Sequence, residues 1–236
     1  MKGTRPLTNE EIVKVADCFE GTYAIRNRSM FMLGVSCGAR ISELLAITIS
    51  DVWQNNRVVH DMSFSKHIVK GKEHARSVPL NTDGRKAVTA LLDWYKSKGF
   101  AEKYLAPDAP LFQSRMGNKP LTRKGADDVL RDAFQKAGLN GKLATHSMRK
   151  SFAQRLYNAT DDVFIIKEML GHQSIATTQK YLGVDYMFVK EAVEVISVTS
   201  KESQNLTPLH RVTDEEFLLE AVKRGYNVEK KIETDA

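Results

Sequence analysis

Apolar residues recur every three to four positions over much of the chain, a spacing typical of amphipathic helices. Near the start, Thr8 and Glu11 form a capping box directly before the first such segment. A mostly apolar helix is predicted over residues 22–37, and a third helix, which begins near Gly38, carries the segment ARISELLAI. The N-terminal part of the chain is therefore predicted to be helical.

The pattern changes over residues 56–80, where short β-prone runs replace the helical spacing. These runs flank the segment KGKEHA, so they predict a small antiparallel sheet or hairpin. Helical periodicity returns over residues 82–97, and the Pro- and Gly-marked stretch 100–120 is predicted to be a loop with one short strand. Further helices are predicted near residues 122–137, 146–158 and 161–170, within 171–182, and over 186–197.

These elements predict an α+β fold that is mainly α-helical, with one small antiparallel sheet. Residues 1–182 are predicted to form one domain, and residues 183–236 a helical C-terminal extension. The longest apolar run is too short to span a bilayer, and the N-terminus lacks the apolar core of a signal peptide. We therefore expect a cytoplasmic protein in which Cys18 and Cys37 are buried free thiols.

The formal net charge of +6 is unevenly distributed along the chain. From residue 186 onward there are ten acidic and seven basic residues, a net of −3, which leaves +9 on the rest. A basic body of this kind fits a polyanionic partner, most simply nucleic acid. Charge alone does not identify DNA as that partner, because many basic proteins bind none.

The segment LATHSMRKSF, residues 143–152, places cations at the start of a predicted helix, where the helix dipole disfavours them. His146 and Arg149 are three residues apart and therefore share one helix face. First-turn backbone N–H groups also bind anions, so a phosphate would explain this arrangement. A solvated turn with a capping histidine is the structural alternative. Lys150 points elsewhere, and we predict a DNA-backbone contact or a plain surface position for it.

Three further segments hold ionisable groups that a purely structural role does not require. In CGARISELLAI, Arg40 follows two small residues, and Glu43 lies one helical turn later, where it can hold the guanidinium. The Lys-Gly-Lys turn of SKHIVKGKEHARSVPL can carry a cation into a site. In MLGHQSIATTQKYL, His172 precedes Tyr181 by nine residues. Taken separately, these segments also fit a surface ion pair, a solvated hairpin, and a polar turn before a half-buried aromatic residue.

Together the four segments predict one site with two arginines, a lysine, two histidines and a tyrosine. The chain has no paired carboxylates at this site and no HxxxH, HxH, CxxC or GxxxxGK[ST] pattern, which argues against a catalytic metal and against nucleotide hydrolysis. A tyrosine can instead attack a phosphodiester directly and form a phosphotyrosine. The two guanidiniums would stabilise the pentacoordinate transition state, and the lysine would protonate the leaving oxygen.

The segments GARISELLAI, KGK…VPL, His-x-x-Arg and LGHxSIxTTxxY resemble, in order and approximate spacing, the tyrosine recombinases, also called the phage integrase family. The similarity runs from about Leu7 to Leu182. It implies a tyrosine-recombinase-like catalytic domain that cleaves and rejoins double-stranded DNA with no metal or other cofactor. The residues that carry the resemblance are Arg40, Lys70, His146, Arg149, His172 and Tyr181.

The resemblance also implies a role for each of these residues. Tyr181 is expected to be the nucleophile, which forms a 3′-phosphotyrosyl link and releases a 5′-hydroxyl. Arg40 and Arg149 are expected to clamp the scissile phosphate, and Lys70 to protonate the leaving 5′-oxygen. The remaining expectations are proton transfer near the nucleophile by His146, hydrogen-bond donation to the phosphate by His172, and support of the site by the acidic residue Glu43.

Two points of this match stay open. The hairpin differs by one residue from the common form, so Lys72 is the alternative to Lys70 as general acid and is otherwise expected to contact DNA. The N-terminal core-binding domain usual in the family is absent from this sequence, either naturally or because the chain was trimmed. The family further implies a homotetramer on DNA, accessory DNA-bending proteins, and association with the nucleoid. It also implies contact of residues 186–197 with a neighbouring protomer, for which packing of this segment on its own domain is the alternative.

Two rival functions share part of this pattern. A type IB topoisomerase uses similar phosphotyrosine chemistry without strand exchange. A non-catalytic DNA-binding regulator could use the same fold, although a pure binder has no need for a nucleophile. The sequence leaves open the DNA target and the choice among integration, excision, inversion and resolution.

Overall fold

The computed structural model of the protein describes residues 3–64, 76–98, 104–115, 117 and 119–182. All of them lie in the first of the two units into which the chain divides, Met1–Gly183 and Val184–Ala236. The helix predicted over residues 186–197 lies outside the described residues. Within the described part of the chain, no helix is long and apolar enough to cross a membrane.

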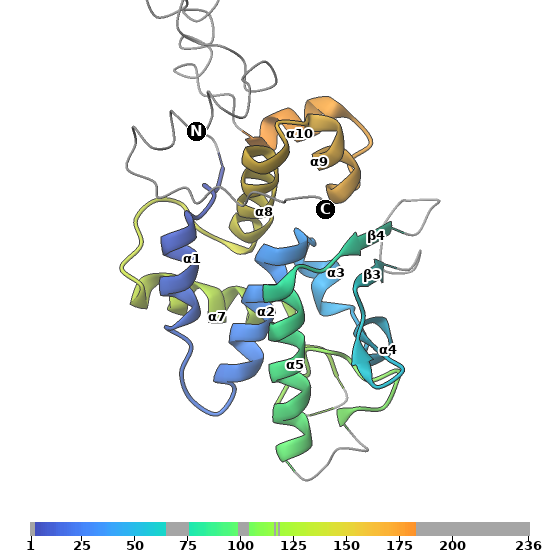
Figure 1. The fold of residues 1–236 in the computed structure, drawn as a ribbon. Helices are drawn as coiled ribbons and strands as arrows, with labels where there is room; N and C mark the ends of the chain where they lie inside the picture. Colours follow the sequence, from blue (N-terminus) through green and yellow to red (C-terminus); the bar gives the residue numbers. More distant parts are fainter. Residues whose placement is uncertain (1–2, 65–75, 99–103, 116, 118, 183–236) are drawn as a thin grey trace, which may run out of the picture. The chain divides into compact units, whose positions relative to one another are not determined.

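Helices make up most of the described fold, and two short strand pairs interrupt them (Figure 1). The helices are α1 (Asn9–Ala16), α2 (Ala24–Cys37), α3 (Ile41–Leu45), α4 (Ile49–Val52), α5 (Thr82–Ser97), α7 (Arg123–Lys136), α8 (Thr145–Thr160), α9 (Val163–Leu170) and α10 (Ile175–Leu182). The strands are β1 (Trp53–Gln54), β2 (Arg57–Val58), β3 (Asp61–Phe64) and β4 (Arg76–Pro79). The predicted mainly helical α+β fold is confirmed.

The strands form two separate two-stranded antiparallel sheets, where the sequence predicted one. β3 pairs with β4, with Met62 opposite Val78, and this pair is the predicted hairpin. The additional pair joins β1 to β2 through Asn55 and Asn56, whose φ angles are 52° and 58°. Asparagine tolerates positive φ, and a two-residue turn with two positive φ angles matches the twist of a hairpin, so this turn closes the extra strand pair.

Helix boundaries agree well with prediction where a capping residue marks them. The capping box of Thr8 and Glu11 is present at the start of α1. α5 occupies the predicted range 82–97, and the side chain of its N-cap, Asn81, accepts a hydrogen bond from the N–H of Gly84. A cap satisfies backbone N–H groups that have no partner within the helix, so it fixes the first residue of the helix.

Two smaller predictions were wrong in part. The strand expected within residues 100–120 is reduced, among the described residues, to isolated bridges that involve Pro110 and Gln113. Both cysteines are free, as predicted, but only Cys37 is buried, and Cys18 is partly exposed at the end of α1. Burial raises the pKa of the Cys37 thiol to about 11, so this side chain behaves as an apolar core residue.

α2 lies at the centre of the main core and contacts α1, α3, α5, α7 and α8. It ends at Gly38, whose φ of 61° is unfavourable for residues with a Cβ atom. A Cβ atom at this position would overlap the ring of Phe152 on α8. Gly38 therefore allows α8 to approach the end of α2, which brings together two segments that are distant in the sequence.

A second, smaller apolar cluster joins α8, α9 and α10. Its buried members are Ala153, Ile166 and Leu170, and Leu182 of α10 packs against them. α10 contacts both α8 and α9. The helix whose sequence contains Tyr181 is therefore held on the same helix, α8, whose N-terminal end contains His146 and Arg149.

Candidate active site

Arg40 and Glu43 bind each other at the start of α3, as their spacing predicted. Glu43 accepts a hydrogen bond from the backbone N–H of Arg40 at 2.8 Å and forms an ion pair with the Arg40 guanidinium at 2.6 Å. The Glu43 side chain is only 2% exposed, whereas that of Arg40 is 38% exposed. The pair is therefore more than a surface ion pair, because a buried carboxylate holds a guanidinium that faces solvent.

Glu43 also faces two other arginines, which come from distant elements. Arg76 Nη2, on β4, lies 3.1 Å from its Oε2, and Arg149 Nη1, on α8, lies 3.9 Å from the same oxygen. Burial by itself raises the pKa of Glu43, but the charge of Arg76 and the hydrogen bonds from Arg40 outweigh it and keep the pKa below its ordinary value. Glu43 is therefore a carboxylate at neutral pH.

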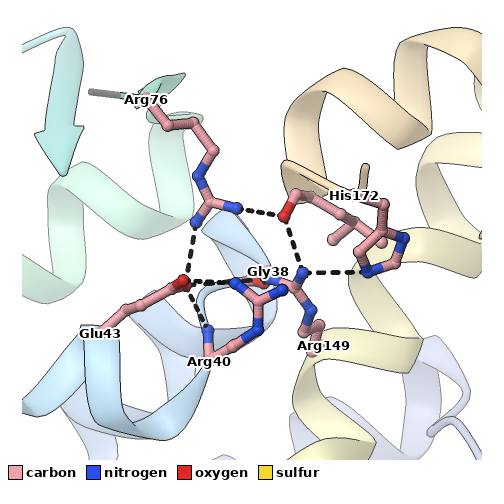
Figure 2. Close-up of polar contacts among 7 residues, drawn as sticks. Gly38, Arg40, Glu43, Arg76, Arg149 and His172 are labelled. Atoms are coloured by element: carbon pink, nitrogen blue, oxygen red, sulfur yellow. Dashed lines mark hydrogen bonds and ion pairs between the residues drawn. The ribbon is translucent and has the colours of Figure 1, made fainter. Parts of the chain in front are cut away.

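Arg149 is almost fully buried, with 1% of its side chain exposed. Its Nη1 donates a hydrogen bond to the carbonyl oxygen of Gly38 at 2.6 Å, and its Nη2 donates one to the carbonyl oxygen of Leu170 at 2.7 Å (Figure 2). These carbonyls lie at the C-terminal ends of α2 and α9, which carry partial negative charge. Two helix ends thus orient this guanidinium beside Arg40.

His172 lies against Arg149 and contacts α10 on its other side. Arg149 Nη2 is 3.1 Å from His172 Nε2, and His172 Nδ1 is 3.0 Å from the hydroxyl of Thr178 on α10. His172 is 6% exposed and Thr178 is fully buried. The imidazole therefore connects Arg149 to the helix that contains Tyr181.

The start of α8 carries no acidic residue in its first turn, and its N-cap is Ala144. His146 is exposed at this helix start, yet partial desolvation of its ring lowers its pKa below the ordinary value of 6.5, and the nearby charges of Arg149, Arg123 and Arg40 lower it further. His146 is therefore neutral at pH 7 and able to accept a proton. This electrostatic environment also includes Arg123 of α7, which the sequence did not single out.

Lys150 lies partly buried against the N-terminal segment of the chain. Its Nζ donates a hydrogen bond to the carbonyl oxygen of Thr4 at 2.7 Å. The next residue, Ser151, accepts a hydrogen bond from the backbone N–H of Leu7 at 2.8 Å. Lys150 therefore takes part in holding residues 4–7 on α8, and a contact of Lys150 with DNA stays a prediction.

Three predicted site residues cannot be placed in this geometry. Lys70 and Lys72 lie outside the described residues. The backbone of Tyr181 lies in the last turn of α10, and its side chain is not among the described parts. The described residues contain no group of three histidine, cysteine, aspartate or glutamate side chains that could hold a metal ion, and a metal-free site stays a prediction.

Sequence reasoning missed Arg76, Thr178 and the carbonyl group of Leu170. A signal for Arg76 was present, because alternation along β4 places Arg76 and Val78 on the buried face of the strand. A cation on the buried face of a strand needs an anionic or carbonyl partner inside the protein. No comparable signal exists for the Leu170 carbonyl, because every residue has one.

Comparison with known proteins matches nearly the same segment of the chain that carries the sequence resemblance, about Leu7 to Leu182. A model of the Phage integrase family matches residues 5–187. The chain is 30% identical to the tyrosine recombinase XerC of Chromohalobacter salexigens over 193 residues, which are 80% of this chain and 59% of that protein. It is 34% identical to the tyrosine recombinase XerD of Mycobacterium tuberculosis over 175 residues, which are 73% of this chain and 52% of that protein.

Solved structures show the same similarity in three dimensions. XerH, a site-specific recombinase in a pre-cleavage complex with its difH substrate, aligns with a TM-score of 0.61 at 26% identity, over 80% of this chain and 53% of that one. The XerA recombinase aligns with a TM-score of 0.63 at 23% identity, over 80% of this chain and 63% of that one, and shows the common fold. The chain thus spans little more than half the length of the curated relatives it matches.

Proposed function

The chain belongs to the phage integrase family, and on that premise we propose that it breaks and rejoins double-stranded DNA through a 3′-phosphotyrosine intermediate. It would act as a site-specific recombinase in integration, excision, inversion or resolution. Support comes from relatives named as tyrosine recombinases and from a similar recombinase that was solved on its DNA substrate.

The observation that carries the proposal is the positive charge gathered around Glu43. Arg40, Arg76 and Arg149 face this one carboxylate, at 2.6, 3.1 and 3.9 Å. The three guanidiniums leave a local excess of positive charge in a largely buried position, which is costly unless an anion compensates it. A phosphodiester is such an anion. It gains negative charge in its pentacoordinate transition state, so the site would stabilise that state more than the ground state.

Within this site, Arg40 and Arg149 are the two arginines assigned to the scissile phosphate. Arg40 is partly exposed and can contact a nonbridging oxygen directly. Arg149 is buried under the ends of α2 and α9 and acts at short range through its charge and its N–H groups. Guanidinium groups suit this role because their planar N–H donors match phosphate oxygens in pairs.

Cleavage would proceed by direct displacement at phosphorus. The Tyr181 oxygen attacks the phosphorus atom while the bond to the 5′-oxygen breaks, and the phenolic proton passes to neutral His146. Lys70, or Lys72 in its place, protonates the leaving 5′-oxygen. Because the phosphotyrosine retains the energy of the broken bond, a 5′-hydroxyl can reverse the reaction without a metal ion or a nucleotide.

The proposal extends to the organisation of the protein. Residues 1–182 would form the catalytic domain, and residues 183–236 would form an extension whose segment 186–197 contacts a neighbouring protomer. On DNA the protein would assemble as a homotetramer, with accessory DNA-bending proteins where the site requires them. Its place would be the cytoplasm, in association with the nucleoid.

Covalent trapping tests this proposal. The protein is incubated with a pool of DNA duplexes that carry random sequence around a nick at a fixed position. Cleavage near the nick releases a short piece of strand, which diffuses away, so the covalent adduct cannot be reversed and persists. Denaturant-resistant protein–DNA adducts are then isolated, and their DNA is sequenced. The expected result is an adduct with enriched sequence for the wild type and none for Tyr181→Phe.

The other outcomes are equally informative. An adduct that persists in Tyr181→Phe would exclude Tyr181 as nucleophile. Binding of DNA without any adduct would favour a non-catalytic regulator. Relaxation of supercoiled plasmid without a paired site would favour a type IB topoisomerase.

A further inference from the structure

Arg76 is a buried residue at the centre of the candidate site. It lies at the start of β4 with 8% of its side chain exposed. Its two terminal nitrogens point to opposite sides, Nη2 toward Glu43 and Nη1 toward Leu170 (Figure 2). We propose that Arg76 is a positioning residue, which fixes the guanidinium groups of Arg40 and Arg149 relative to each other. This proposal rests on the proposed function, in which these two arginines bind the scissile phosphate.

The first half of this link runs through Glu43. Arg76 Nη2 donates a hydrogen bond to Glu43 Oε2 at 3.1 Å. The same oxygen accepts a hydrogen bond from the backbone N–H of Arg40 at 2.8 Å. The other oxygen, Oε1, binds the Arg40 guanidinium. Arg76 therefore fixes the rotation of the carboxylate, and the carboxylate fixes both the backbone and the side chain of Arg40.

The second half runs through the carbonyl oxygen of Leu170 at the C-terminal end of α9. Arg76 Nη1 donates a hydrogen bond to it at 2.5 Å, and Arg149 Nη2 donates one at 2.7 Å. One acceptor thus holds both guanidiniums. Because Arg149 also binds His172, a shift of the α9 end would move Arg149 and His172 together.

The shape of the arginine side chain explains why this position requires it. A guanidinium presents its N–H donors in a rigid planar fork, so one side chain can hold two acceptors from different elements at a fixed separation. A lysine ammonium is a point charge on a flexible stem and does not impose that separation. The Arg76 guanidinium also lies over the ring of Phe64 on β3, 4.7 Å from its centroid, which fixes the plane of the fork.

Burial distinguishes positioning from direct phosphate binding. Both terminal nitrogens of Arg76 have protein acceptors, and the side chain is nearly inaccessible to solvent. Arg40, by contrast, keeps more than a third of its side chain exposed. Arg76 would therefore act through Arg40 and Arg149, and its loss would weaken their charge stabilisation of the transition state.

The experiment compares two scissile groups in the nicked duplex that wild-type trapping recovers. One substrate carries the ordinary phosphodiester and the other a methylphosphonate, in which a methyl group replaces one nonbridging oxygen. The methylphosphonate is neutral, so its transition state has one negative charge fewer and depends less on well-placed guanidiniums. The rate of adduct formation is measured with each substrate for each variant.

Arg76→Met removes both polar contacts and leaves an apolar side chain over Phe64. With the phosphodiester, we expect its rate to fall about 10- to 100-fold, the size expected when catalytic groups are displaced by up to about an ångström. With the methylphosphonate, the loss should be several times smaller. Arg76→Lys, which can hold one acceptor but not both, should lie between wild type and Arg76→Met.

Arg26→Met is the matched control. Arg26 is 4% exposed, donates a hydrogen bond to the carbonyl oxygen of Gln113 at 2.8 Å, and lies 4.5 Å from the ring centroid of Tyr23, so it resembles Arg76 in burial and bonding. Its loss should lower stability but leave the ratio of the two substrate rates at the wild-type value. Melting curves for each variant separate folding from catalysis.

The positioning role would be overturned if a folded Arg76 variant formed adducts more slowly by the same factor with both substrates. It would also be overturned if the rate of adduct formation did not fall at all. If Arg76→Met does not fold, the substrate ratio of Arg76→Lys decides the question in the same way. Failure of the wild type to form any adduct would instead overturn the proposed function. The two failures are therefore distinguishable.

Discussion

Nη2 of Arg149 lies 3.1 Å from Nε2 of His172, and this contact determines which nitrogen of the imidazole carries the proton. A guanidinium has only donors, so Nε2 must be the acceptor and the ring proton must reside on Nδ1. Nδ1 then donates to the Thr178 hydroxyl, 3.0 Å away. In this state His172 orients Arg149, and donation to a phosphate would require its proton to move to Nε2.

The first prediction concerns this tautomer. In the DNA-free protein at pH 7, His172 should be neutral with its proton on Nδ1, because Arg149 occupies the other nitrogen as a donor. Nitrogen-15 NMR of the imidazole, assigned by comparison with His172→Gln, measures the tautomer directly. A proton found on Nε2 would contradict the hydrogen-bond pattern.

The second prediction concerns Thr178, which is fully buried. Thr178→Val keeps the volume but removes the acceptor for the Nδ1 proton, and a buried donor left unsatisfied costs about 1–3 kcal/mol of unfolding free energy. Thr178→Ser keeps the hydroxyl and should retain most of the stability. Denaturant unfolding measures both, and equal losses in the two variants would point to packing rather than to the hydrogen bond.

Covalent trapping adds a functional readout to the same pair. Because α10 carries both Thr178 and the backbone of Tyr181, loss of the contact with His172 should slow adduct formation in Thr178→Val more than in Thr178→Ser. A normal rate in Thr178→Val would show that this contact has no part in placing the helix.

The third prediction concerns the charge of Glu43. Glu43→Gln leaves buried guanidiniums without their carboxylate, and removal of one partner from a buried ion pair costs about 3–5 kcal/mol of unfolding free energy. Sulfate or phosphate ions should restore part of that loss, because they can bind beside the arginines and supply the negative charge that the variant lacks. Thermal unfolding with and without sulfate measures both effects.

Asp93→Asn is the control for that experiment. Its exposed ion pair with Lys96 should be worth no more than about 1 kcal/mol. Sulfate should therefore stabilise this variant no more than it stabilises the wild type. A sulfate effect of equal size in both variants would show that the ion acts on the whole protein rather than at the Glu43 site.

The fourth prediction concerns pH. The pKa of His146 is lowered below 6.5, so the folded state resists its protonation. The stability that the neutral ring contributes is complete above pH 6.5 and is lost as pH falls through the lowered pKa. The rate of adduct formation should fall at acidic pH, with a midpoint below pH 6.5. In His146→Gln the rate should be lower overall, and this fall at acidic pH should disappear. An unchanged fall in the variant would assign it to another group.

Local features of the molecule could be predicted from the sequence because their physical causes lie within one or two turns of chain. The capping box at Thr8 placed the start of α1, and the periodicity of residues 82–97 placed α5. The three-residue spacing of Arg40 and Glu43 predicted their contact, since such residues are neighbours on a helix. The ordered motifs indicated the family because their residue types and intervals are themselves sequence features.

Contacts that hold the site together could not be predicted in this way. Arg149 and Gly38 are 111 residues apart and Arg76 and Leu170 are 94 apart, and in both pairs the acceptor is a backbone carbonyl. Every residue has a backbone carbonyl group, so no residue type in the sequence marks the ones that bind a guanidinium. Those carbonyls are decided by tertiary packing, in which Gly38 lets α8 pack against α2, and α9 lies near β4. The sequence alone determined the chemical groups and the helices that carry them, and the tertiary structure decided the buried partners, the tautomer of His172 and the central place of Arg76.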